Sequence, residues 1–192
     1  FTIMKLKKIQ IRETNTNDFD NIMNVEKKAF GYDKEAKLVA ELLTDKTAEP
    51  IVSLLAFHKN QAIGHILFTR AYIEGLEKHA MIHILAPLAV IPEFQRQGIG
   101  NQLIKAGIQL LQEKGTDLIF VLGHKEYYPK YGFIPDAGRL GYPAPYPILK
   151  EYADCWMVLP INKTSFEIGK GKIKCSNILN KPEHWRNEES DR

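Results

Sequence analysis

Two glycines one residue apart, Gly98 and Gly100, stand at the start of an amphipathic stretch in "AVIPEFQRQGIGNQLIKAG", residues 89–107. The first N–H groups of a helix have no partner within the helix, and the helix dipole places about half a positive charge there. Glycine lets an anion approach those N–H groups closely, and Arg96 adds a full positive charge beside them. The pattern indicates a phosphate site, and a diphosphate suits it better still.

Other interpretations of these glycines remain open. Gly98 and Gly100 could simply let the helix begin cleanly or pack closely against a neighbour. A dinucleotide-binding fingerprint needs a third glycine where Leu103 stands and a tighter strand-to-helix turn than residues 91–97 allow. The run "GKGK" from Gly169 lacks the spacing of a P-loop and is typical of a solvated turn.

Hydrophobic periodicity predicts the elements that would position this site. A strand is expected from Lys8, then two helices, a hairpin turning near residues 59–61, a strand over 79–90, a helix over 98–114 and a strand over 117–123. A short helical turn, an aromatic loop and a strand over 153–161 follow, with "GKGKIKCS" as a further candidate strand. The expected apolar stripes of the three helices are Phe19, Ile22, Met23, Ala29 and Phe30; Leu38, Val39, Leu42 and Leu43; and Leu103, Ile104, Ile108 and Leu111.

This order of elements predicts a mixed α/β domain built around one sheet. Pro87 lies inside an expected strand, where the missing backbone donor predicts a bulge or an unpaired edge. Residues 1–160 are expected to form the main domain and residues 161–192 a C-terminal extension of it. The tail from Pro182 onward is expected to be loose.

Composition narrows the class of protein. A chain of 192 residues fits one domain, and its formal net charge of +3 suits a small anionic ligand without arguing for nucleic acid. No apolar run approaches the roughly 20 residues that span a bilayer, and no secretory signal is expected. Cys155 and Cys175 stand far apart, so neither a metal cluster nor a disulfide scaffold is expected, and a cytoplasmic location is favoured.

The stretch "LAVIPEFQRQGIGNQLI" resembles the acetyl-CoA site of the GNAT superfamily of N-acetyltransferases. The family pattern is Q/R-x-x-G-x-G/A after an apolar strand, and Gln95, Gly98 and Gly100 match it. The order of elements also agrees over about residues 8–159. The resemblance implies a twisted, mostly antiparallel sheet that is splayed between its fourth and fifth strands, with helices on both faces.

The resemblance also implies acetyl-CoA as cosubstrate, with no metal. Its pyrophosphate would sit on the N–H groups of the glycine motif, and its pantetheine arm would run beside the preceding strand, where a backbone N–H could polarise the thioester carbonyl. The implied cofactor-binding residues are Leu88, Ala89, Val90, Gln95, Arg96, Gln97, Gly98, Ile99, Gly100 and Asn101.

Tyr128, in "YYPKYGF", matches the tyrosine with which many family members protonate the departing thiolate. Tyr127 is the second candidate, and both could instead be wall or core aromatics together with Tyr131. The sequence departs from the family after its fifth strand, where Gly123 and His124 replace a common asparagine, so the role of His124 stays open.

The general base is not fixed by the sequence. The fourth strand has no glutamate, but His79 and His83 stand four apart and are expected on one face. His83 is the candidate base, although a strand histidine is more often a hydrogen-bonded or solvated group. A zinc site made by the two histidines lacks a third ligand.

The expected activity is transfer of acetyl from acetyl-CoA to a primary amine of a small molecule or of a protein. The alternative is a catalytically silent acetyl-CoA-binding regulator or subunit. The loop after Phe30, the hairpin near Asn60 and the stretch "GRLGYPAPYP" are expected to border the acceptor groove. Neither nucleic acid nor a membrane is expected as a partner, because basic and acidic residues are interspersed, and a homodimer is possible.

Overall fold

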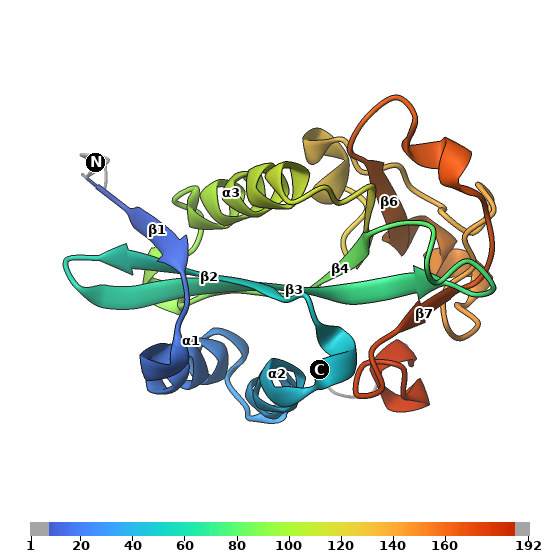
Figure 1. Ribbon diagram of the computed structural model, residues 1–192. Helices are drawn as coiled ribbons and strands as arrows, with labels where there is room; N and C mark the ends of the chain where they lie inside the picture. Colours follow the sequence, from blue (N-terminus) through green and yellow to red (C-terminus); the bar gives the residue numbers. More distant parts are fainter. Residues whose placement is uncertain (1–7, 187–192) are drawn as a thin grey trace.

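A single sheet organises the protein, whose computed structural model describes residues 8–186 (Figure 1). Six strands of that range are neighbours in chain order, and a seventh, β7, pairs with β3. All neighbouring strands are antiparallel except β4 and β5, which are parallel. The strands are β1 (Gln10–Glu13), β2 (Val52–His58), β3 (Gln61–Ile73), β4 (Ile82–Val90), β5 (Leu118–Leu122), β6 (Trp156–Pro160) and β7 (Ile173–Cys175).

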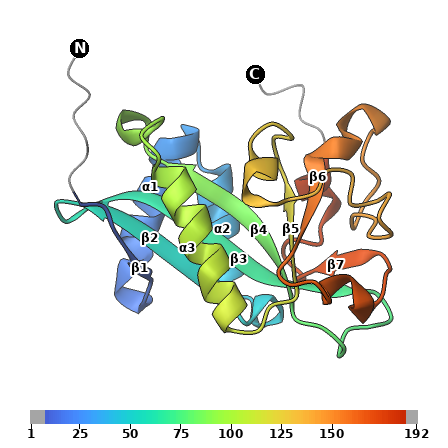
Figure 2. The same ribbon diagram turned by 90° about the horizontal axis from the view of Figure 1, so that it is seen from above.

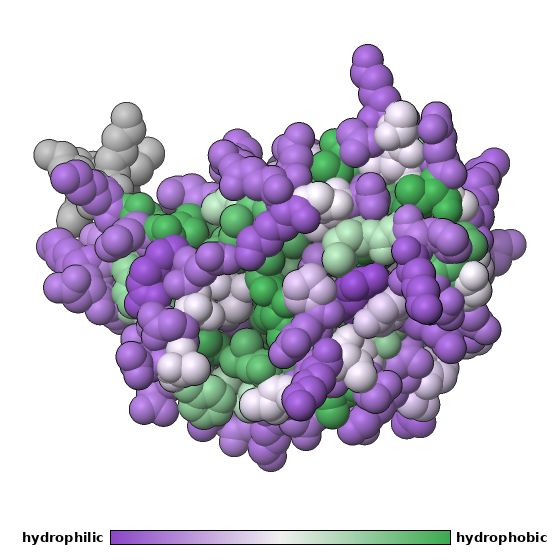
Figure 3. All heavy atoms as spheres, in the orientation of Figure 1, coloured by the Kyte–Doolittle hydropathy of each residue, from purple (hydrophilic) through white to green (hydrophobic). Residues whose placement is uncertain are grey.

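Helices cover both faces of the sheet. Helices α1 (Phe19–Phe30) and α2 (Lys34–Thr44) lie below it in Figure 1, and α3 (Ile99–Glu113) lies above. Figure 2 shows α3 crossing the strands, where it contacts β2, β3 and β4. On the face seen in Figure 3, hydrophilic side chains surround the patches where apolar side chains reach the surface. The expected mixed α/β domain with a sheet covered on both faces is confirmed.

The first helix differs in detail from its expected apolar stripe. Ile22 is buried as expected, but Phe19 is 45% exposed. Phe19 is the first residue of α1, directly after a short 3-10 turn, so it lies at the end of the helix rather than over the core. Val25 and Glu26, which the stripe omitted, are fully buried.

The break expected at Pro87 is confirmed. The β3–β4 register shifts between Ile66 and Phe68, opposite the Ala86–Pro87 peptide. Pairing of β4 with β5 ends at Leu85 and Val121, so the two parallel strands separate beyond that point. This separation produces the splayed sheet that the motif implied.

The C-terminal segment is ordered where a loose tail was expected. Pro182–Trp185 form a short 3-10 helix, and Trp185 is only 4% exposed. The Trp185 ring meets the Trp156 ring edge-on at 5.3 Å, and its Nε1–H donates to the Leu179 carbonyl at 2.9 Å. The expectation is therefore wrong for residues 182–186, because burial of a large indole fixes them; residues 187–192 lie outside the described range.

Among the helices of residues 8–186, none has both the length and the apolar composition that a membrane span requires.

A buried polar chain links α1 to the sheet. His65 Nδ1 on β3 lies 2.6 Å from Glu26 Oε1, and His65 Nε2 lies 2.8 Å from Ser53 Oγ on β2. The Glu26 and His65 side chains are both 0% exposed. Burial raises the pKa of Glu26, and the hydrogen bond with His65 opposes that shift. These hydrogen bonds join α1 to β2 and β3, which are far from it in sequence.

Glu26→Ala is expected to lower the free energy of unfolding by about 3 kcal/mol, because His65 loses its partner while it stays buried. Urea unfolding followed by circular dichroism measures the change. The matched control is Glu41→Ala on α2, where the side chain is exposed. Equal stabilities of the two variants would show that the buried pair does not hold α1 on the sheet.

Candidate active site

A cavity of about 470 Å³ opens where β4 and β5 separate. Its floor comes from the ends of these two strands, and its walls come from α2 and from the C-terminal segment. The polar or ionisable side chains that line it are Lys34, Glu35, His124, Tyr128, Glu183, His184 and Arg186. The cavity thus combines the apolar ends of two strands with several groups that can exchange protons.

Tyr128 lies in this cavity, at the start of the short 3-10 helix Tyr128–Tyr131 that follows β5. Its ring packs on Gly123, where a Cβ would stand only 2.4 Å from Tyr128 Cε2. The side chain is mostly buried, and no hydrogen-bond partner for its hydroxyl is found among residues 8–186. Burial raises the pKa of Tyr128 far above its usual value, so the hydroxyl is protonated at neutral pH.

The second tyrosine candidate, Tyr127, has a different position. Its hydroxyl accepts a hydrogen bond from Tyr131 at 3.2 Å. A Cβ added to Gly100 would stand 2.9 Å from this hydroxyl, so Tyr127 lies against the start of α3. The Lys130 ammonium lies 4.1 Å from the centre of the Tyr127 ring. Tyr127 is not among the residues that line the cavity.

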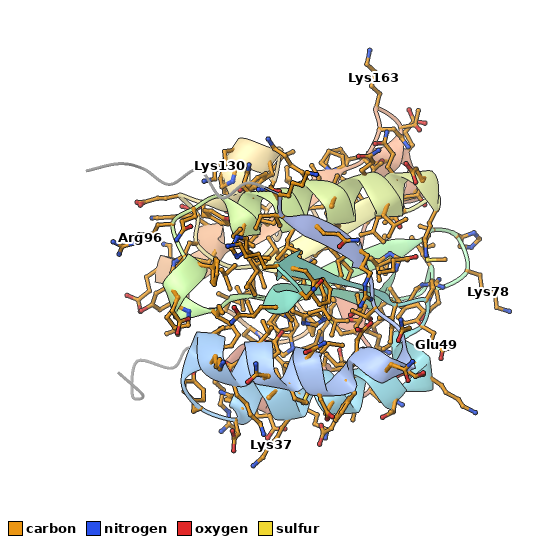
Figure 4. The ribbon with its side chains drawn as sticks, turned by 90° about the vertical axis from the view of Figure 1, so that its left-hand side faces the viewer. Lys37, Glu49, Lys78, Arg96, Lys130 and Lys163 are labelled. Atoms are coloured by element: carbon orange, nitrogen blue, oxygen red, sulfur yellow. The ribbon has the colours of Figure 1, made fainter. Side chains whose placement is uncertain are left out.

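The start of α3 has the backbone geometry that the glycine pattern predicted. Gly98 caps the helix in the left-handed region, with φ of 83°, and no side chain caps the helix. Within residues 8–186 the N–H groups of Ile99, Gly100 and Asn101 have no hydrogen-bond acceptor. Arg96, just before the helix, is exposed, and Figure 4 shows its side chain reaching away from the body of the molecule. The arrangement provides several aligned donors and an exposed positive charge for an anion.

Two glutamines of the motif hold its loop. The side-chain amide of Gln95 donates to the Val90 carbonyl at 2.9 Å, and that of Gln97 donates to the Glu93 carbonyl at 3.1 Å. Contacts from these residues to a ligand would therefore come from their backbone.

The end of β4 connects the helix start with the cavity. Leu88, Ala89 and Val90 pair with β3 on one edge, whereas the other edge has left β5 after Leu85. Leu88 lines the cavity, and its Cδ2 atom would lie 3.6 Å from a Cβ on Gly100. The strand edge that does not pair with β5 therefore lies between the start of α3 and the cavity that Tyr128 lines.

Comparison with known proteins decides the family. The model of the "Acetyltransferase (GNAT) family" matches residues 19–133. The chain belongs to the GNAT acetyltransferase family. An N-acetyltransferase of Escherichia coli K12, YjhQ, is 50% identical over 163 residues, which are 85% of this chain and 90% of YjhQ. Another from the same strain, YhbS, is 32% identical over 108 residues, 56% of this chain and 62% of YhbS.

Solved structures agree with the fold. The GNAT N-acetyltransferase YhbS of Escherichia coli, crystallised with CoA, has a TM-score of 0.80 at 24% identity, covering 91% of this chain and 93% of that one. A GNAT acetyltransferase of Brucella melitensis in complex with acetyl-CoA has a TM-score of 0.70 at 25% identity, covering 90% and 98%. The resemblance read from the glycine motif is confirmed.

In this GNAT protein, His83 does not have the position of a general base. Its Nε2 lies 2.8 Å from the Pro50 carbonyl and its Nδ1 lies 3.1 Å from Thr116 Oγ1. Burial lowers its pKa to about 4, so the ring is neutral, donates to Pro50 and accepts from Thr116. Both nitrogens are thus occupied, and His83 is not among the residues that line the cavity. His79 precedes β4, so the two histidines do not share a strand face as expected.

Neither cysteine lines the cavity. Cys175 is buried on β7, where burial raises the pKa of its thiol. Cys155 is half-buried just before β6, and its carbonyl accepts from the Gly123 N–H at 2.9 Å. Both cysteines are thus part of the packed fold and lie outside the cavity.

The sequence interpretation missed Glu35 and His184, which line the cavity from α2 and from the C-terminal segment. Glu35 carried no local signal, because one glutamate in the first turn of a helix is commonplace. His184 falls in the tail that was expected to be loose. The aromatic neighbour Trp185 was the only signal that this segment is anchored.

Proposed function

We propose that this protein transfers the acetyl group of acetyl-CoA directly to a primary amine, of a small molecule or of a protein. The supporting observation is the cavity between β4 and β5, which is lined by Tyr128, whose protonated hydroxyl has no hydrogen-bond partner among residues 8–186. The start of α3, whose first N–H groups have no acceptor within residues 8–186, lies beside the same strand end. The end of β4 thus connects a site for a diphosphate with a proton donor. A thioester carried on CoA needs both.

The proposed cofactor contacts follow from these positions. The backbone of residues 96–101, including Arg96, Gly98 and Asn101, would bind the diphosphate, and the edge at Leu88 and Ala89 would pair with the pantetheine arm. A backbone N–H of this edge would stabilise the oxyanion as the amine attacks. Val90 and Gln95 bond to each other, and would therefore support this edge.

Tyr128 would complete the transfer. The amine nitrogen forms a bond to the acetyl carbon, and the carbon–sulfur bond of the thioester breaks. The thiolate takes the Tyr128 proton, and the phenolate regains a proton from the new amide nitrogen. No metal is required for these steps. The alternative is a catalytically silent acetyl-CoA-binding protein. In such a protein the Tyr128 hydroxyl would have no role.

Thermal unfolding with and without acetyl-CoA tests the proposal. A ligand present at 100 times its Kd stabilises the folded state by about 2.7 kcal/mol. Acetyl-CoA is expected to raise Tm, whereas acetyl-pantetheine, which lacks the diphosphate, is expected to raise it far less. An amine that then releases CoA thiol establishes catalysis. Equal effects of the two thioesters would reject the diphosphate site, and binding without thiol release would favour the silent protein.

A further inference from the structure

One wall of the cavity is separate from the elements that we propose to bind the thioester. It is formed by the start of α2 and by residues 183–186, which line the same cavity as the strand ends and Tyr128. The C-terminal part lies beyond residues 19–133, which match the family model. The amine must enter from a side that the thioester leaves open, so the chemistry of this wall bears on which amine binds.

Glu35 contributes a carboxylate to this wall. Its Oε2 atom is buried and has no hydrogen-bond partner among residues 8–186. This is so although two cations, Lys34 and Arg186, line the same cavity. Glu26 on α1 also has a buried Oε2 without a hydrogen-bond partner among these residues, and the charge of Glu35 contributes to the raised pKa of Glu26. Incompletely paired carboxylates are costly, so a cationic ligand beside the Glu35 carboxylate is favoured here.

His184 supplies a neutral imidazole to the same wall. The side chain is 13% exposed, and its Nε2 lies 3.7 Å from Glu183 Oε1, beyond hydrogen-bond distance. Burial, as the largest cause, lowers its pKa; Lys34 and Lys181 lower it further, and Glu183 and Glu41 oppose them. The ring is therefore unprotonated at neutral pH and can accept a proton.

Neighbouring contacts fix His184 in position. Its backbone N–H donates to the Lys181 carbonyl at 3.1 Å, and the next residue, Trp185, is anchored on Leu179 and Trp156. The buried indole of Trp185 therefore holds the backbone at His184 in place, which an exposed tail could not do. The position is thus suited to proton transfer with a bound ligand.

We infer that the acceptor is a cationic aliphatic amine, whose ammonium group Glu35 binds and whose first proton His184 removes. This inference rests on the proposed acetyl transfer. The ammonium gives one proton to the His184 imidazole, and the free amine attacks the acetyl carbon. The carbon–sulfur bond breaks, the thiolate takes the Tyr128 proton, and the phenolate takes the second proton from nitrogen. One proton remains on His184 and passes to solvent, which balances the reaction.

The test compares Glu35→Gln and His184→Gln with two acceptors, propylamine and aniline. Propylamine is cationic at neutral pH, whereas aniline is uncharged and needs neither an ammonium site nor an initial deprotonation. With propylamine, Glu35→Gln is expected to raise KM about tenfold, and His184→Gln to lower kcat about 100-fold. With aniline both variants are expected to stay within about threefold of the wild type, and the Kd of acetyl-CoA within about twofold.

Matched controls are Glu113→Gln and His79→Gln, which change exposed side chains outside the cavity and are expected to leave all constants unchanged. Equal losses with both amines would show that Glu35 and His184 act only through structure, and would overturn the inference. Acetyl-CoA binding without thiol release by propylamine would also overturn it. Absence of acetyl-CoA binding would instead refute the proposed function itself.

Discussion

Replacing Tyr128 by phenylalanine is expected to lower kcat for acetyl transfer by about 100- to 1,000-fold, while the Kd of acetyl-CoA stays within about twofold. The ring packs on Gly123 and lines the cavity, and these contacts do not require the hydroxyl. The variant therefore keeps the shape of the site and loses only the proton donor. Release of CoA thiol measures kcat, and calorimetric titration measures the Kd.

Tyr131→Phe is the matched control, because it removes a hydroxyl from the same short helix and breaks only the bond to Tyr127. This variant is expected to keep kcat within about threefold of the wild type. The raised pKa of Tyr128 adds a second check. Because burial keeps the phenol protonated, wild-type kcat is not expected to fall at the pH where an ordinary tyrosine ionises. An unchanged kcat in Tyr128→Phe would remove this residue from the mechanism.

Gly100→Asp is expected to raise the Kd of acetyl-CoA by about 100-fold or more. Two like charges about 4 Å apart near a protein surface repel by about 4 kcal/mol, and each 1.4 kcal/mol changes the Kd tenfold. An acidic residue in the first turn of a helix is otherwise favourable, so the charge itself does not destabilise α3. Calorimetric titration with acetyl-CoA measures the Kd, and thermal unfolding without ligand checks the fold.

Gly100→Asn separates charge from bulk. Both side chains must displace the Tyr127 hydroxyl, which would lie 2.9 Å from the new Cβ. The asparagine variant is therefore expected to bind acetyl-CoA more weakly than the wild type but clearly better than the aspartate variant. Equal Kd values for the two variants would mean that no phosphate lies near these N–H groups.

Local patterns predicted the parts of the site that local chemistry determines. The open N–H groups at the start of α3 were predicted from Gly98 and Gly100, and the bulge was predicted from Pro87. The hairpin turn near residues 59–61 was also predicted, and both Lys59 and Asn60 have positive φ. Each of these features depends on residues that are near neighbours in the chain.

Features that depend on distant partners were not predictable in this way. From the sequence, His83 was a candidate base. In the fold, Pro50 and Thr116, each 33 residues away, bond to both of its ring nitrogens. Glu26 is buried because His65, 39 residues later, bonds to it. Periodicity records which face of a helix or strand is apolar, but it carries no information about which polar groups meet across the core.

The C-terminal segment follows β7, which pairs with the end of β3 rather than with the strands that separate. Residues 175–180 are bonded to one another and to the turn at residues 45–47, so β7 keeps its place when only the residues beyond 180 vary. An exchange of residues 181–186 between related chains would then be expected to alter amine preference and leave thioester handling intact. Under the proposed roles of Glu35 and His184, substrate choice would then be modular, and new acceptors could arise without rebuilding the transfer chemistry.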